Sequence, residues 1–311
     1  MAKSRTKTQT KKIKGRLSAI IVCICLLVVA TLAITDYFGI FTYEKLISVF
    51  GLNNGVVVDG DLSVHFINVG QGDCSLIISN GETALIDAGE AENADTVVSY
   101  LNSQGIKRLD YVIVSHPHSD HMGGISIVLE SFEIGKVIVP KVSEEMTPTT
   151  KTYKVFLQTV QNEGLKLTPA RVGDVYNLGE ASLEVLAPNS EYKDLNNYSV
   201  VALLTHGENK FLFTGDAESE SEKEMLKKGL LTGVDVLKVG HHGSNTSSKK
   251  KFLEVVRPDY AVIMCGDNSY NHPHKETIDN LLEYTDNIYR TDQQGTIVFI
   301  SDGENLNVRY E

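Results

Sequence analysis

The stretch YVIVSHPHSDHMGG, residues 111–124, decides how the rest of this chain is interpreted. A short β-branched strand runs directly into His116, His118, Asp120 and His121, four side chains that can each bind a metal ion. Imidazole and carboxylate suit zinc, manganese or iron, and alternate side chains of such a loop can point at two neighbouring ions. The stretch predicts the core of a metal site; a chance solvent-facing cluster is the alternative.

Three other apolar runs end in side chains that bind metals. Asp87 ends LIDAG (85–89), Asp216 ends FLFTGD (211–216), and His241 and His242 follow the strand in DVLKVGHHGS (235–244). A polar residue at the end of an apolar strand usually points into a cleft. Each is open to another interpretation as a turn residue, and Asp216 is also a candidate N-cap. Together the four strand ends predict one metal-binding cleft.

The body of the chain alternates short β-branched runs with amphipathic stretches. Hairpins in each half, with helices between them, predict an α/β (α+β) fold in which two sheets pack face to face under outer helices. No linker interrupts 61–311, so one domain is expected there. Strands are predicted at 62–69, 74–79, 83–88, 111–115, 136–140, 181–187, 199–205, 210–215, 235–240, 260–265 and 296–300, and helices at 91–104, 152–163, 217–229, 248–256 and 275–284.

The N-terminal region has the pattern of a membrane signal-anchor. Residues 1–16 contain seven Lys and Arg and no acidic residue, and the uncharged run LSAIIVCICLLVVATLAI follows. We therefore predict a cytoplasmic basic arm (1–16), one transmembrane helix (17–35), a linker (36–60) and a hydrolase domain outside the cytoplasm. A cleaved signal peptide is the competing interpretation, and an internal buried helix leaves the basic flank without a role.

The remainder of the chain is acidic. Taking those seven from the 29 Lys and Arg leaves 22 basic residues against 40 acidic ones, which argues against broad electrostatic gripping of nucleic acid. Lys249, Lys250 and Lys251 are the exception: they either attract phosphates at a cleft rim or form a solvated helix face. The four cysteines show no CxxC spacing, so neither a zinc ribbon nor a disulfide framework is expected.

The ordered motifs resemble the metallo-β-lactamase-fold hydrolase superfamily, and within it the extracytoplasmic nuclease-like domain of ComEC-type DNA-uptake (competence) proteins. The likeness covers nearly all of 62–300 and implies an αββα sandwich with metals at one edge of the sheets. It is carried by VGQGDCSLI (69–77), LIDAG (85–89), HPHSDHMGG (116–124), NNYSVVALL (196–204), FLFTGD (211–216), DVLKVGHHGS (235–244), NSYNHPH (268–274) and YRTDQQGTIVF (289–299).

The resemblance implies two divalent ions, Zn²⁺ or Mn²⁺. The first would be held by His116 and His118, the second by Asp120, His121 and His241, and both by Asp216. His241 is preferred as the ligand because it comes first after its strand, which leaves His242 behind it. Asp87 would orient a ligand imidazole through the free ring nitrogen. The loop that contains Asp73 would shape the site without touching metal.

One segment departs from the broad superfamily. Where a third histidine for the first ion is usual, this chain reads Asn196-Asn197-Tyr198-Ser199, a version that ComEC-type sequences share. Asn197 and Ser199 are therefore uncertain members of the site, the first ion is expected to bind more weakly, and occupancy by one metal is an alternative. The missing histidine argues against a β-lactam hydrolase.

The expected chemistry is hydrolysis by a metal-activated hydroxide. Asp120 and Asp216 would orient the nucleophile, and His272 is the candidate proton donor to the leaving oxygen, with a plain rim residue as the alternative. The predicted substrate is DNA or another phosphodiester, with no nucleotide cofactor. The alternatives are a cell-envelope phosphoesterase of the phosphocholine and teichoic-acid type, and a non-catalytic binding domain on the same fold.

Overall fold

The computed structural model describes residues 61–310. The predicted basic arm, membrane span and linker, residues 1–60, lie outside the described residues, so these assignments stay predictions. No helix between residues 61 and 310 is both long enough and apolar enough to cross a bilayer.

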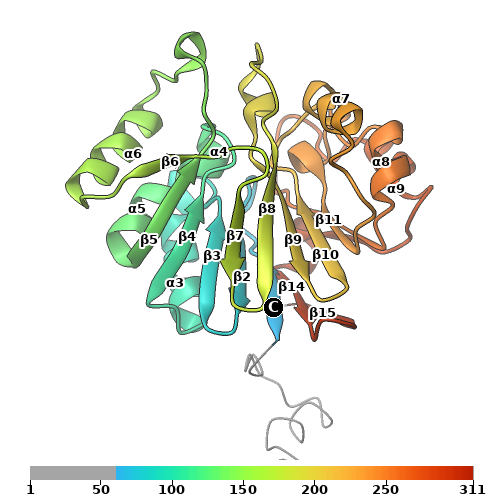
Figure 1. The fold of residues 1–311 in the computed structure, drawn as a ribbon, viewed down its shortest axis with the longest axis horizontal. Coiled ribbons are helices and arrows are strands. Elements are labelled where there is room, and N and C mark those ends of the chain that lie inside the picture. Colours follow the sequence, from blue (N-terminus) through green and yellow to red (C-terminus); the bar gives the residue numbers. More distant parts are fainter. Residues whose placement is uncertain (1–60, 311) are drawn as a thin grey trace, which may run out of the picture. The chain divides into compact units, whose positions relative to one another are not determined.

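Two β-sheets form the centre of the described region (Figure 1). The first has the order β15-β14-β1-β2-β3-β4-β5-β6 and the second the order β13-β12-β11-β10-β9-β8-β7. The strands of the first sheet are β1 (Leu62–Phe66), β2 (Ser75–Ser79), β3 (Glu82–Ile86), β4 (Arg108–Ile113), β5 (Glu133–Val139), β6 (Leu167–Pro169), β14 (Ile297–Ser301) and β15 (Leu306–Tyr310). Those of the second are β7 (Val175–Leu178), β8 (Ala181–Ala187), β9 (Val201–His206), β10 (Asn209–Phe213), β11 (Val236–Lys238), β12 (Tyr260–Ile263) and β13 (Ile288–Arg290).

Helices cover the outer face of each sheet (Figure 1). Helices α3 (Ala94–Ser103), α5 (Ile125–Ser131) and α6 (Lys151–Asn162) pack on the first sheet, while α7 (Ser219–Lys228), α8 (Lys250–Val256) and α9 (Lys275–Leu281) pack on the second. Two very short helices, α4 (Ser119–Met122) and α10 (Thr291–Gln294), and four 3₁₀ turns, η1 (Ala91–Asn93), η2 (Glu144–Met146), η3 (Leu195–Tyr198) and η4 (Gly240–Gly243), complete the elements.

Three apolar layers hold this arrangement together. The layer between the sheets includes Phe66 and Phe213, whose rings stack at 5.8 Å, and each outer layer joins one sheet to its helices. Burial of apolar surface on both faces of each sheet explains why its central strands read as nearly continuous apolar runs. The predicted αββα sandwich of an α/β chain is confirmed.

Strand direction determines where the polar loops meet. β3 pairs in parallel with β4 in the first sheet, and β10 pairs in parallel with β11 in the second. The carboxyl ends of parallel strands lie at one edge of a sheet, where α/β folds usually place their ligands. Asp87, His116, Asp216 and His241 each follow one of these four strands and meet at that edge.

Candidate metal centre

The loop after β4 and the short helix α4 supply four of the predicted ligands. His116 and His121 are fully buried, whereas Asp120 and His118 line a cleft of about 510 Å³. The backbone of Gly123 and Gly124 packs so closely on residues 88–91 that a Cβ at either position would clash. The two glycines therefore hold α4 against the end of β3, which fixes the direction of His121.

His116 and His118 form the first ligand group. The Nε2 atom of His116 lies 3.0 Å from Nδ1 of His118 and 3.9 Å from Oδ2 of Asp216. Two imidazole nitrogens this close, each with a lone pair directed at the other, are favourable only if a proton or a cation lies between them. These are the two residues predicted to hold the first ion, and that role stays a prediction.

The second ligand group contains Asp120, His121, Asp216 and His242. One donor atom from each lies within 4.8 Å of the other three. The Nε2 atom of His242 is 3.2 Å from Oδ2 of Asp120, and Nε2 of His121 is 3.2 Å from Oδ1 of Asp216. A set of two imidazoles and two carboxylates suits a divalent transition metal.

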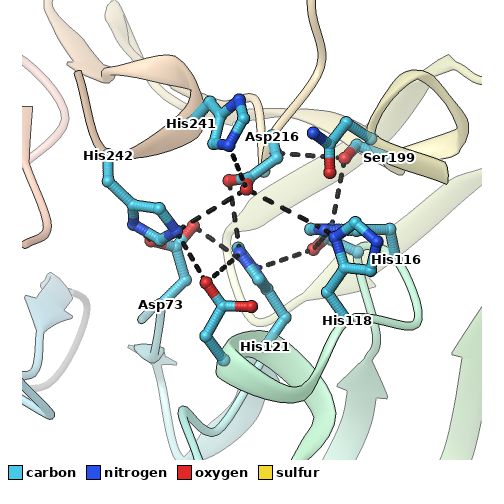
Figure 2. Close-up of polar contacts among 12 residues, drawn as sticks. Asp73, His116, His118, His121, Ser199, Asp216, His241 and His242 are labelled. Carbon is cyan, nitrogen blue, oxygen red and sulfur yellow. Dashed lines mark hydrogen bonds and ion pairs between the residues drawn. The ribbon is translucent and has the colours of Figure 1, made fainter. Parts of the chain in front are cut away.

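Asp216 lies between the two groups (Figure 2). Its Oδ1 faces His121, and its Oδ2 lies 3.6 Å from Nε2 of His242 and 3.9 Å from Nε2 of His116. One carboxylate near imidazoles of both groups has the position expected of a bridging ligand. The bridging role of Asp216 stays a prediction.

The centre fits cations because its buried donor atoms lack other partners. Nε2 of His121 and Oδ1 of Asp216 are buried and make no hydrogen bond among the described residues. Burial would raise the pKa of Asp216, but His121, His242 and His241 outweigh it and hold the pKa well below its usual range. A buried carboxylate that stays ionised needs positive charge beside it, which protons on the imidazoles or metal ions can supply.

Partners behind the site fix the tautomers of three imidazoles. Nδ1 of His121 donates to Oδ2 of Asp87 at 2.9 Å, and Nδ1 of His242 donates to the carbonyl of Met264 at 2.9 Å. Ser115 donates its hydroxyl proton to Asp87 at 2.6 Å, so its oxygen accepts from Nδ1 of His116 at 3.1 Å. With each Nδ1 protonated, each Nε2 presents a lone pair to the centre.

The structure favours His242 over the predicted His241 as the fourth ligand of the second group. Nε2 of each histidine lies 3.6 Å from Oδ2 of Asp216, but the His241 side chain is 21% exposed and that of His242 only 2%, and Nε2 of His242 also lies 3.2 Å from Asp120. Nδ1 of His241 lies 3.2 Å from Thr246 and 3.3 Å from Glu218. Both histidines have left-handed backbone, with φ of 51° and 52°. Such strained backbone in two consecutive non-glycine residues is costly and is typical of functional sites. We propose His242 as the ligand.

Lys238 is a member of the site that the sequence did not single out. Its side chain is 2% exposed, its Nζ pairs with Asp73 and donates to the carbonyl of Gly215 at 2.9 Å. Asp73 in turn lies 3.4 Å from Nδ1 of His242 and 3.7 Å from Nδ1 of His121. The sequence feature that could have identified Lys238 is its place inside the apolar run DVLKVG. A lysine buried in such a strand requires a buried anion beside it.

The segment in place of the third histidine supplies no imidazole and stabilises its neighbours. Ser199 accepts from the backbone N–H of Asp216 at 3.0 Å and lies 3.4 Å from Nδ1 of His116. Asn197 accepts from the N–H groups of Glu218 and Ser221 at the start of α7. Asn197 and Ser199 therefore stabilise the loop that contains Asp216. In the part of the chain that the structure describes, this segment adds no third imidazole to His116 and His118.

His272 borders the same cleft, with its ring centroid 5.3 Å from that of His241. Burial and the nearby His241 and His242 lower its pKa to about 4. Its Nδ1 atom is buried without a hydrogen-bond partner. A neutral ring can hold a leaving group through its N–H, and the proton-donor role of His272 stays a prediction.

The lysine triplet lies in a neighbouring cavity and not in the metal cleft. Lys249, Lys250 and Lys251 line a hollow of about 330 Å³ together with Lys223 and the buried Glu222. None of these residues lines the cleft described above. The three lysines therefore line a basic cavity between α7 and α8, and not the rim of the metal cleft as one of the two interpretations of the sequence predicted.

Comparisons with known proteins agree with this architecture. A profile of the metallo-beta-lactamase superfamily matches residues 67–267. The chain is 32% identical to ComE operon protein 3 of Bacillus subtilis, with 76% of this chain and 32% of that protein aligned. It is also 32% identical to Recombination protein 2 of Haemophilus influenzae, with 75% of this chain and 28% of that protein aligned. The chain thus spans about a third of the length of these relatives.

A solved structure of similar fold is the metallo-beta-lactamase fold protein YhfI from Bacillus subtilis. It superimposes with a TM-score of 0.53 over 78% of this chain and 100% of that one, at 14% identity, which speaks for the fold alone. With two matched sheets and the His and Asp cluster at their edge, this chain belongs to the metallo-beta-lactamase superfamily, and its homologues include competence proteins of the ComEC type.

Proposed function

We propose that this protein is a metal-dependent phosphodiesterase that cleaves DNA outside the cytoplasmic membrane. The observation that carries the proposal is Asp216, whose carboxylate lies within 3.9 Å of imidazole nitrogens from both groups of ligands. Two divalent ions, Zn²⁺ or Mn²⁺, would supply an acidified water as nucleophile and positive charge for a phosphoryl oxygen. The first group offers fewer ligands, so a single ion in the second group remains an alternative.

The chain's own residues would do the rest of the work. His116, His121 and His242 are oriented as ligands. The Nδ1 atom of each ring donates a hydrogen bond, which leaves Nε2 directed at the centre. Asp120, whose carboxylate borders the cleft, can orient a nucleophilic water. His272 can hold the leaving oxygen through a ring N–H.

DNA is supported as the substrate by the relatives' names and by the basic cavity. Two of them are named Recombination protein 2 and Competence protein ComA. The lysine cavity adjoins the metal cleft through two segments, 218–219 and 246–249, since Glu218 and Thr246 contact His241 while Ser219 and Lys249 line the cavity. A strand of nucleic acid that leaves the cleft would meet these lysines.

A second function is favoured by one observation. Among the described residues that line the metal cleft there is no lysine or arginine. A cleft without fixed cations suits a substrate with a single phosphoryl group, such as the phosphocholine of a cell-envelope polymer. Membrane anchoring through 17–35 is part of either proposal.

The test is a substrate panel on the purified chain, loaded with Mn²⁺ or Zn²⁺. We expect cleavage of single-stranded DNA and of bis(4-nitrophenyl) phosphate, and loss of both on chelation. Asp216→Asn should lower both activities by at least about 100-fold, since it removes charge from both ligand groups. Hydrolysis of a phosphocholine ester without any DNA cleavage would select the second function, and activity that survives chelation would contradict both.

A further inference from the structure

An exposed tyrosine stands in the wall of the metal cleft. Tyr270 is 66% exposed, the highest value among the large apolar side chains that are exposed in residues 61–310, yet it lines the cleft together with His118 and Asp120. Its ring stacks on that of His272, with centroids 5.6 Å apart and planes at 28°. An exposed aromatic ring next to the metal ligands needs an explanation, because the fold would be more stable if the ring were buried.

The loop that carries this ring is held in one conformation. Oδ1 of Asn268 accepts from the N–H groups of Tyr270 and His272 at 3.1 and 3.0 Å. Nδ2 of Asn268 donates to the carbonyls of Gly266 and His272 at 2.8 and 2.9 Å. All four bonds fall within the loop, so the ring is presented on an ordered support. A pre-ordered ring loses little conformational entropy when a ligand stacks on it.

Gln71 brings an unused hydrogen-bond donor to the same place. Its Oε1 accepts from the N–H of Gly266 at 3.3 Å, which turns the Nε2 group the other way. Nε2 is buried without a partner among the described residues, and Gln71 lines the same cleft as Tyr270. The loops of Gln71 and Tyr270 pack closely at Gly266. A Cβ at this position would lie 2.5 Å from the backbone nitrogen of Gln71, so only glycine allows this contact.

A flat ring and an unpaired amide donor in the lining of one cleft fit a planar ligand that carries hydrogen-bond acceptors. Nucleobases have both features, and stacking on an aromatic side chain tolerates any base. A quaternary ammonium group is usually held by a cage of several aromatic rings, and Tyr270 is the sole Phe or Tyr among the described residues that line the cleft. Such a group would also leave the amide of Gln71 unpaired.

We infer that Tyr270 and Gln71 form a subsite for one nucleobase of a single-stranded nucleic acid, next to the metal ligands. The inference rests on the proposed nuclease function and extends it. The ring would hold the base by its face and Gln71 would donate to an acceptor on its edge. The nucleotide so held would place its phosphate towards the ligands of the second group.

The test compares binding of a short single-stranded oligonucleotide with that of an abasic oligonucleotide of equal length, both followed by fluorescence anisotropy in EDTA. Tyr270→Ala should weaken binding of the normal oligonucleotide by about 5- to 100-fold and leave abasic binding unchanged. Tyr270→Phe should bind like the wild type, because it keeps the ring. Gln71→Ala should show a smaller loss, again confined to the normal oligonucleotide. Tyr310→Ala, at another exposed tyrosine outside the cleft, is the matched control.

Equal losses on both oligonucleotides would overturn the subsite, because the ring would then serve the loop and not the base. The proposed function is judged separately by cleavage of DNA by the wild-type protein with metal. Cleavage together with an unaffected Tyr270→Ala variant would leave the nuclease and remove the subsite. If the wild type binds no oligonucleotide, and phosphocholine binding depends on Tyr270, both the nucleobase subsite and the nuclease fail.

Discussion

At the scale of the residue, the centre depends on which nitrogen of each imidazole is already in use. Asp87 accepts from His121, and the carbonyl of Met264 accepts from His242, so each of these rings has only Nε2 left for the centre. The Nδ1 atom of His241 also has partners, Thr246 at 3.2 Å and Glu218 at 3.3 Å, but they lie at the edge of the cleft, where the His241 side chain is 21% exposed. A buried hydrogen bond is stronger than one at a solvent-exposed edge, so Asp87 and Met264 orient their imidazoles more firmly before an ion arrives.

The first prediction follows from this difference. His242→Ala should lower the affinity for the ion of the second group by at least about 10- to 100-fold, because a ligand held in place from behind is lost. His241→Ala should change that affinity much less. Calorimetric titration of each purified variant with metal measures the two affinities. His241→Ala costing more than His242→Ala would restore the assignment made from the sequence.

The sequence could identify the pair of histidines but not choose between them. The chain reaches the site through two consecutive residues with left-handed backbone, which no periodic pattern anticipates. The roles of Lys238 and Ser115 could not be predicted from the sequence either, because they depend on Asp73 and Asp87 in loops far away along the chain. The meeting of the side chains that follow the apolar strands could be predicted, because strand direction alone brings them to one edge.

At the scale of the element, the predicted strands and helices are confirmed to within a few residues. The helix α5 was not predicted, and the strands that were not predicted share a cause. The strands that were not predicted are β6, β7, β13 and β15, of three to five residues each. β6, β7, β13 and β15 lie at the four sheet edges. An edge strand is buried on fewer sides, so it needs no apolar run and leaves a weak pattern in the sequence. The central strands were predictable because both faces are buried.

Helix α7 contains a buried carboxylate that gives the second prediction. Glu222 is 3% exposed and accepts from the N–H groups of Ser248 and Lys249, yet burial raises its pKa to about 7. An unfolded glutamate has a pKa of about 4.3, so between these values the folded state binds more protons than the unfolded chain. The contribution of Glu222 to stability is therefore full below about pH 4 and is lost as the pH rises through about 7.

Replacing Glu222 with Gln should remove this dependence. Relative to the wild type, Glu222→Gln should gain about 1–3 kcal/mol in free energy of unfolding between pH 5 and pH 8. Urea unfolding at several pH values measures the difference. Glu220→Gln, at an exposed position of the same helix, should show a flat difference. A flat difference for Glu222→Gln as well would mean that the carboxylate is ionised throughout this range.

At the scale of the whole molecule, charge is distributed unevenly. The chain has a formal net charge of -11, the metal cleft is lined by no lysine or arginine, and the cavity beside it is lined by four lysines. Two of them are partly occupied, since Lys250 pairs with Glu283 and Lys249 donates to the carbonyl of Asn245. A long anionic substrate must therefore be held by this cavity against repulsion from the rest of the surface, whereas a small one has no need of it.

Salt dependence separates these two cases, and it is the last prediction. Changing Lys249, Lys250 and Lys251 to Ala should weaken binding of single-stranded DNA and flatten its dependence on salt, by a slope of about 0.7 for each phosphate that the protein no longer neutralises. Hydrolysis of bis(4-nitrophenyl) phosphate should hardly change, because the ligands of the metal centre are untouched. The triple variant Lys107→Ala, Lys141→Ala and Lys166→Ala removes the same charge from exposed positions outside both hollows, and it should keep the wild-type slope. Cleavage rates and binding between low and moderate salt give the comparison. If both triple variants weaken binding by the same factor, only net charge matters and the lysine cavity has no part in binding DNA.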